Sequence, residues 1–113
     1  MEYKRLEHEV NLLHQRICYA LGDPKRILIL YLLSEQKWCV NEITKLMGIP
    51  QSTVSRHLRV LRERKLVLTE RQGTTILYKL ADPQIIEALN LLRRVLGKQL
   101  RENIDIANLI DIQ

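Results

Sequence analysis

The sequence is poor in aromatic side chains. It has four Tyr, one Trp and no Phe among 113 residues, although hydrophobic residues make up 46% of the chain. The core must therefore be built from Leu, Ile and Val. A chain of this length is expected to form a single domain, residues 1–113, and small domains of this kind often gain stability by pairing with a second copy.

Other absences narrow the class of protein. No apolar run approaches the ~20 residues of a membrane-spanning helix, and the opening MEYKRLEHEV lacks the pattern of a signal peptide, so no membrane partner is expected. Two Cys do not make a disulfide framework, which favours a cytoplasmic protein with reduced thiols. The chain lacks a nucleophile–base pairing, a phosphate-binding Gly loop and paired acids, and it is therefore not expected to be an enzyme.

The positive charge is concentrated in one segment. The formal net charge is +5, and residues 51–79 alone hold seven Lys or Arg against two Asp or Glu, whereas the flanking segments are nearly neutral. A basic segment in an otherwise neutral chain is typical of a protein that binds a polyanion. The alternative is a solvated helix face that is rich in Arg.

Hydrophobic periodicity predicts a mainly α fold with a small β-hairpin. Asp-Pro pairs at 23–24 and 82–83 are typical helix starts, and EQKW is interpreted as a connection. The predicted elements are, in order, helices over 6–21, 24–34, 40–47 and 50–64, a hairpin over 66–80 and a helix from 82 onward.

The third and fourth helices form a predicted helix-turn-helix over residues 40–64, because only a few residues around Gly48 join them. In that motif the second helix enters the major groove of DNA, and the hairpin that follows suits a wing that contacts the backbone or a minor groove. The sequence therefore predicts a winged helix-turn-helix that binds double-stranded DNA.

The fourth helix has an apolar and a polar face. At about 100° per residue, Val54, Leu58 and Leu61 form one stripe, and hydroxyl and Arg side chains point the other way. Short hydroxyls permit close approach to DNA, and Arg offers a bidentate fork to guanine or phosphate. His57, at the edge of the buried face, is interpreted as structural or as a phosphate contact. The predicted DNA-binding residues are Gln51, Ser52, Thr53, Ser55, Arg56, His57 and Arg59, together with Arg71, Gln72 and Thr74 at the hairpin tip.

Three motifs occur in a fixed order: ALGDPKRILIL, WCVNEITKLMGIPQSTVSRHLRVLRERKLV and RQGTTILYKL. From about Ile17 to Leu96 the chain resembles the ArsR/SmtB-type winged-helix transcriptional repressors of bacteria and archaea. The resemblance implies a homodimer that binds operator DNA and is released by an inducer, often a metal ion. It also implies dimerisation through the first and last helices, here 1–21 and 82–113. Apolar stripes on these helices place Leu6, Val10, Leu13, Ile17, Leu89, Leu92 and Leu96 in the expected interface.

The metal sites of that family are not matched. Where many members have Cys-x-Cys, this chain reads Cys39-Val40-Asn41, and where others begin a site with Asp-x-His, it reads Asp82-Pro83-Gln84. No cofactor is therefore expected. A metal site would have to use His14, Cys18 and Cys39; the alternative is an interfacial His and two small buried thiols.

The inducer stays open on sequence grounds. Cys18 and Cys39 are the only pair available for a thiol or redox switch, and regulation without either residue is the third alternative. The alternative function is a winged-helix interaction module whose basic face binds an acidic protein. The C-terminal Ile104, Ile106, Leu109 and Ile110 favour a continued helix or an arm packing on the dimer.

Overall fold

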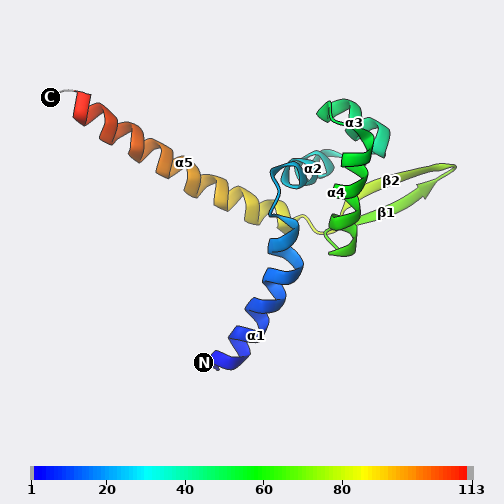
Figure 1. Ribbon diagram of the computed structural model, residues 1–113, viewed down its shortest axis with the longest axis horizontal. Helices are drawn as coiled ribbons and strands as arrows, with labels where there is room; N and C mark the ends of the chain where they lie inside the picture. The colour runs from blue at the N-terminus through cyan, green and yellow to red at the C-terminus, as the bar shows by residue number, and fades with distance from the viewer. Residues whose placement is uncertain (1, 112–113) are drawn as a thin grey trace. The chain divides into compact units, whose positions relative to one another are not determined.

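The computed structural model describes the backbone of residues 2–111 and the side chains of residues 2–103. Contacts divide the chain into two compact units, Met1–Asp82 and Pro83–Gln113. The elements are α1 (Tyr3–Leu13), the π-helix η1 (His14–Cys18), α2 (Pro24–Glu35), α3 (Val40–Met47), α4 (Gln51–Glu63), β1 (Val67–Gln72), β2 (Thr75–Leu80) and α5 (Gln84–Asp111), as Figure 1 shows. Among the described residues, no helix has the length and apolarity needed to span a bilayer.

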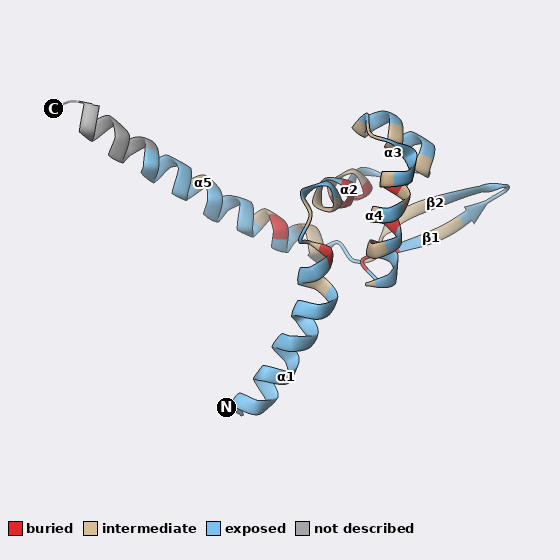
Figure 2. Cartoon of the chain, in the orientation of Figure 1, coloured by how far each residue is buried: buried red, intermediate tan, exposed pale blue. Residues whose placement is uncertain are grey.

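The core of the first unit lies among α2, α3, α4 and the base of the hairpin (Figure 2). The predicted stripe of α4 is confirmed, because Val54, Leu58 and Leu61 are completely buried. They pack in a core that also contains fully buried Ile and Leu side chains of α2 and α3. Each such side chain stabilises the fold by roughly 1.5–3 kcal/mol relative to an exposed one. This packing fixes which face of α4 points outward.

The hairpin is a two-stranded antiparallel sheet that runs in register from Val67 opposite Leu80 to Gln72 opposite Thr75. Gly73 has φ of 65° in the two-residue turn, a conformation that glycine adopts readily. The predicted connection EQKW does more than join helices. Trp38 pairs with Tyr78 of β2 through two backbone hydrogen bonds of 2.8 and 3.2 Å, and its indole Nε1 donates to the Leu32 carbonyl at 2.9 Å.

The predicted helix over residues 6–21 is present, but residues 14–18 in its middle are π-helical and not α-helical. The α-helix ends at Leu13 and a π-helical turn follows, in which the Tyr19 N–H donates to the His14 carbonyl. A π-turn has more residues per turn than an α-helix, so the residues after it are rotated relative to the stripe before it. Ile17, within the π-turn, is half-buried, whereas Leu13 and the rest of α1 are exposed.

The end of α4 carries a strained residue. The N–H of Leu66 donates to the Leu61 carbonyl at 2.9 Å and that of Lys65 to the Arg62 carbonyl at 3.0 Å, the two bonds of a Schellman cap. Lys65 occupies the left-handed position of this cap, with φ of 65°. A side chain in this region costs about 1–2 kcal/mol because its Cβ crowds the backbone.

Lys65→Gly is therefore expected to stabilise the protein. Relief of the strain exceeds the extra entropy that glycine loses on folding, so the free energy of unfolding should rise by about 0.5–1 kcal/mol. Urea denaturation monitored by circular dichroism measures the change. Lys25→Gly, in the first turn of α2, is the contrasting substitution and should destabilise. A Lys65→Gly protein less stable than the unmodified chain would show that the Lys side chain contributes more than its backbone strain costs.

Candidate nucleic-acid interface

The helix-turn-helix is set by the ends of α3 and α4. Gly48 ends α3 in the left-handed region, with φ of 65°, and its N–H donates to the Thr44 carbonyl at 2.9 Å. Pro50, with φ of −58°, is the N-cap of α4. Only Gly48, Ile49 and Pro50 separate the two helices, so α4 begins directly after a tight turn. The observed helix-turn-helix runs from Val40 to Glu63, within one residue of the predicted range 40–64.

The N-terminus of α4 differs from those of α2 and α3. Asp23 caps α2 by accepting from Lys25 N at 2.8 Å, and Glu42 closes a capping box on α3 by accepting from Cys39 N at 3.0 Å. No described side chain caps α4, and its first turn contains no acidic residue. The N–H groups of Gln51 and Ser52, both exposed residues, are thus available, and the helix dipole favours an anion there.

The face of α4 opposite its buried stripe is open and basic. Ser52, Arg56 and Arg59 are exposed along it, as is Gln51 at its start. Thr53, Ser55 and His57 are half-buried on its flanks. The polar and cationic groups therefore form a single outward strip, from the helix N-terminus to its middle.

Arg26 of α2 holds the flank of α4 in place. Its Nε donates to the Ala20 carbonyl at 2.7 Å and its Nη2 to the Tyr19 carbonyl at 3.0 Å. Its Nη1 lies 3.4 Å from Nδ1 of His57. If Arg26 donates here, the neutral imidazole carries its proton on Nε2. Sequence analysis missed Arg26, and its place after Asp23-Pro24 was the one available clue.

Burial lowers the pKa of His57 below its usual value. The carboxylate of Asp23 opposes this shift, and the guanidinium groups of Arg26 and Arg56 add to it. The environment of His57 thus favours the neutral imidazole, which fits its hydrogen bond with Arg26.

The pKa of His57 gives stability a pH dependence. In the unfolded chain the imidazole binds a proton near pH ~6.5, whereas in the folded chain its lowered pKa delays protonation. The unfolded state therefore binds more protons in this window, and the stabilisation present above pH ~6.5 is lost as the pH falls. In urea denaturation between pH 7.5 and about 5, His57→Gln should show a shallower loss of stability than the unmodified chain. An equal dependence of stability on pH in the two proteins would contradict the assignment of this effect to His57.

The wing offers a second group of polar side chains. Arg71, Gln72 and Thr74 are all exposed, but only Thr74 lies in the turn, because β1 continues through Gln72. The prediction that all three lie at the hairpin tip is therefore correct for Thr74 only, and Arg71 and Gln72 lie at the end of β1. At the base, Lys37 Nζ lies 2.6 Å from Glu70 Oε2, and this hydrogen bond holds the pKa of Glu70 below its usual value.

The residues considered for a metal or thiol site, His14, Cys18 and Cys39, differ in exposure. Among the described side chains, no three His, Cys, Asp or Glu residues gather in a group fit for a metal. Both thiols are free, with Cys18 exposed in η1 and Cys39 half-buried, so the alternative that both are buried hydrophobes is wrong. Cys39 is the N-cap of α3, where its side chain accepts from the backbone of the third helical residue.

The expected dimer residues are mostly uncovered. Leu6, Val10 and Leu13 on α1 are 41–49% exposed, and Leu92 and Leu96 on α5 are 63% and 51% exposed. Ile17 is half-buried and Leu89 is buried. The predicted C-terminal residues Ile104, Ile106, Leu109 and Ile110 fall outside the described side chains, although the α5 backbone continues through Asp111.

A tight helix-turn-helix followed by an antiparallel hairpin defines the winged helix-turn-helix class. The family model for bacterial regulatory proteins of the arsR family matches residues 23–68. The uncharacterised HTH-type transcriptional regulator Rv0081 of Mycobacterium tuberculosis is 36% identical over 88 residues, 77% of each chain. Its crystal structure matches with a TM-score of 0.73 and 30% identity, covering 91% of this chain and 99% of that one. The chain belongs to the ArsR family.

Two further relatives are informative. The HTH-type transcriptional repressor SmtB of Mycobacterium tuberculosis is 43% identical over 63 residues, 56% of this chain and 47% of that protein. The chain spans about half the length of several curated relatives that it matches. The homodimeric winged helix-turn-helix DNA-binding domain of Mb0332 from Mycobacterium bovis matches with a TM-score of 0.76 and 26% identity, covering 89% of this chain and 93% of that one.

Proposed function

We propose that this chain is a sequence-specific DNA-binding transcriptional regulator, a cytoplasmic repressor that binds its operator as a homodimer. The observation that carries the proposal is the exposed strip of α4. There the uncapped helix N-terminus, Ser52, Arg56 and Arg59 all face outward, opposite a fully buried apolar stripe. The relatives SmtB and Rv0081 of Mycobacterium tuberculosis are named as a transcriptional repressor and a transcriptional regulator.

The groups on this strip have separate roles in the proposed complex. The N–H groups of Gln51 and Ser52 bind a backbone phosphate at the helix N-terminus. Arg56 and Arg59 enter the major groove and offer bidentate contacts to guanine or to phosphate. Thr53, Ser55 and His57, on the flanks, contribute shorter polar contacts. Arg71, Gln72 and Thr74 of the wing contact the neighbouring backbone and help to fix the register.

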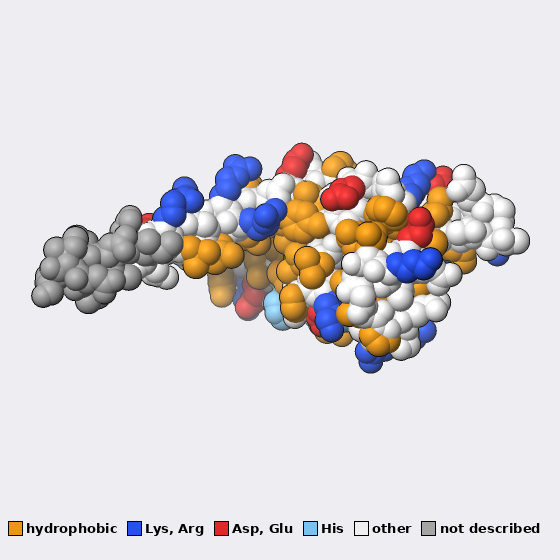
Figure 3. Space-filling model, turned by 90° about the horizontal axis from the view of Figure 1, so that it is seen from above, with side chains coloured by type: hydrophobic (Ala, Val, Ile, Leu, Met, Phe, Trp, Pro, Cys, Tyr) orange, Lys and Arg blue, Asp and Glu red, His pale blue; other side chains and the backbone are white. Residues whose placement is uncertain are grey.

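Dimerisation is proposed through α1 and α5. Both helices present large apolar side chains to solvent in the single chain, and contiguous exposed apolar surface typically marks an interaction site. On the face of α5 shown in Figure 3, hydrophobic side chains line one side and basic side chains the other. At about 100° per residue, Leu92 and Leu96 lie on one side of α5, and Arg94 and Lys98 lie on another. A two-fold dimer would cover the apolar side and give two copies of α4 for a palindromic operator.

Fluorescence anisotropy with DNA from upstream of the gene, against a random duplex of equal length, tests this proposal. A DNA-binding regulator should prefer the operator by about 10³-fold or more and lose affinity steeply with salt. The titration is repeated with Arg56→Ala, which removes a charge from the exposed face of α4. Arg94→Ala removes the same charge from α5 and is the control. Equal affinity for both duplexes would refute the proposal. Binding to an acidic protein but to neither duplex would favour the interaction-module alternative.

The same titration tests the thiol hypothesis. Binding is measured with reductant and after mild oxidation, in the unmodified chain and in Cys18→Ser and Cys39→Ser variants. If oxidation lowers the operator affinity of the unmodified chain, and each substitution alone prevents that loss, these two residues are the sensor. Unchanged affinity would direct the search for an inducer to other ligands.

A further inference from the structure

Two arginine side chains contact the end of the first helix, residues 3–20. The guanidinium of Arg64, the C-cap residue of α4, lies 4.6 Å from the centre of the Tyr19 ring, and that of Arg26 lies 5.6 Å from it. Both lie within about 6 Å, the range of a cation–π contact. The Nη1 of Arg64 also donates to the Gln15 carbonyl at 2.9 Å, across 49 positions of the chain. Arg64 therefore binds the first helix twice, through a ring and through the backbone.

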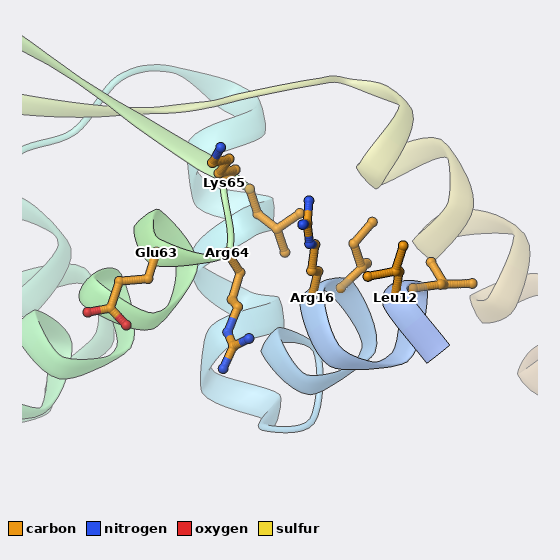
Figure 4. Close-up of a pocket in the computed structure, with 8 residues that line it drawn as sticks. Leu12, Arg16, Glu63, Arg64 and Lys65 are labelled. Carbon is orange, nitrogen blue, oxygen red and sulfur yellow. The ribbon is translucent and has the colours of Figure 1, made fainter. Parts of the chain in front are cut away.

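The backbone of Arg64 is held firmly. Its N–H donates to the Val60 carbonyl at 3.0 Å, and the Schellman cap of Lys65 and Leu66 follows directly. Leu66 is buried, with 3% exposure. Figure 4 shows the Arg64 side chain extending away from Lys65. The guanidinium thus extends from a backbone position that both the helix end and the core fix.

Arg26 of α2 makes a second connection between the first helix and α4. It donates to the carbonyls of Tyr19 and Ala20, and its Nη1 lies 3.4 Å from Nδ1 of His57 in α4. His57 and Arg64 are separated by about 10 Å along the helix, at a rise of about 1.5 Å per residue. Two attachment points this far apart fix the direction of α4 relative to the first helix, whereas a single point would permit it to pivot.

Few other contacts within the chain fix the direction of the first helix. Ala20 is completely buried and anchors the end of this helix in the core. From Glu2 to Tyr19 every residue is exposed except Ile17, which is half-buried. The angle at which the first helix leaves the core therefore depends strongly on the contacts of Arg64 and Arg26.

We infer that Arg64 is a positioning residue that sets the half-site spacing of the operator, acting through Tyr19 and Gln15. This role rests on the proposed function, in which the first helices belong to the dimer interface and two copies of α4 enter the DNA. The angle between the first helix and α4 then determines how far apart the two copies of α4 lie. Base pairs are about 3.4 Å apart along the duplex, so moving each α4 by about 1.7 Å changes the preferred spacing by about one base pair.

The alternative is a direct contact between Arg64 and DNA. The side chain of Arg64 is half-buried and already engaged with the first helix. It also lies at the opposite end of α4 from Gln51 and Ser52, where the proposed phosphate contact is made. A DNA contact would raise the affinity for every duplex, whereas a positioning residue changes how affinity depends on the spacing of the half-sites.

Anisotropy titrations on a series of operator duplexes test this inference. The half-sites stay constant, and the spacer between them is shortened or lengthened by one or two base pairs. The unmodified chain should lose affinity by about tenfold for the first base pair of change. Arg64→Met keeps the length of the side chain and removes the guanidinium, and it should lose only about threefold. Its affinity for a duplex with one half-site should equal that of the unmodified chain.

Tyr19 offers a matched pair of variants. Tyr19→Leu removes the ring that Arg64 contacts and should show the same weaker dependence on spacing, whereas Tyr19→Phe keeps the ring and should behave as the unmodified chain. Tyr19 is 52% exposed, so neither change disturbs the core. Tyr19→Leu should add little to Arg64→Met, because both remove the same contact. Arg62→Met removes an exposed cation from the last turn of α4 and is the control.

Circular dichroism and sedimentation equilibrium should show that these variants are folded dimers. If Arg64→Met does not fold, the two Tyr19 variants decide the question by the same criterion. Full dependence on spacing in Arg64→Met, or an equal weakening of that dependence in Arg62→Met, would overturn the inference. So would a loss in Arg64→Met by one factor for all duplexes, because Arg64 would then contact DNA or only stabilise the fold. If the unmodified chain prefers its operator, such a result overturns this inference alone; if it prefers no duplex, the proposed function fails as well.

Discussion

Replacing Leu92 with Glu is expected to convert the proposed dimer into monomers. Leu92 is 63% exposed in the single chain, so the substitution creates no cavity within it. In a two-fold dimer the change occurs twice, and each copy loses the burial of a Leu, worth roughly 1.5–3 kcal/mol, and gains a buried carboxylate that costs several more. The dimer should therefore be weakened by well over about 5 kcal/mol.

Sedimentation equilibrium measures this effect, and operator binding should fall with it because a monomer engages only one half-site. Lys98→Glu places the same carboxylate on the basic side of α5 and should leave the dimer intact. Circular dichroism shows whether the Leu92→Glu chain is folded. A folded Leu92→Glu protein that sediments as a dimer would assign Leu92 to a surface outside the interface.

The second large effect is expected at Arg56, which is exposed on the face of α4 opposite Leu58. If its guanidinium contacts a base, Arg56→Ala should weaken operator binding by about 1–3 kcal/mol and relax the preference at that position. Folding should be little affected, because the side chain is outside the core. Anisotropy titrations on the operator and on single-base variants measure both quantities.

Arg56→Lys separates two kinds of contact. Lys keeps the charge and loses the bidentate fork, so it should preserve a phosphate contact and fail at a guanine. If Arg56 contacts a phosphate, Arg56→Ala should instead lower the affinity for all DNA sequences equally. The slope of log affinity against log salt concentration should then be smaller by about one. Operator affinity equal to that of the unmodified chain in both variants would remove Arg56 from the interface.

The sequence predicted those parts of the fold that depend on local pattern. Val54, Leu58 and Leu61 are spaced to share one helix face, and packing buries all three completely. Asp23 before Pro24 predicted the start of α2, and the Asp23 side chain caps it as expected. Such features follow from periodicity and capping, which are properties of neighbouring residues.

The features that were missed depend on residues far apart in the chain or on backbone geometry that side-chain periodicity does not encode. Trp38 pairs with Tyr78, and Arg26 reaches His57, in both cases across more than 30 positions. The π-turn after Leu13 leaves the apolar spacing of α1 intact, so a pattern of hydrophobic residues cannot reveal it. The positive φ of Lys65 was equally hidden, because Gly is the usual residue at this kind of cap.

The pairing of Trp38 has a practical consequence. It is the only Trp in the chain, its indole N–H is bonded to Leu32 of α2, and its backbone is bonded to Tyr78 of β2. Intrinsic fluorescence excited at the indole band therefore comes from one position, at the junction of the wing and the helical body. The emission spectrum is thus a built-in optical reporter of wing docking, and a red shift during denaturation or ligand titration would record the moment at which this junction opens to water.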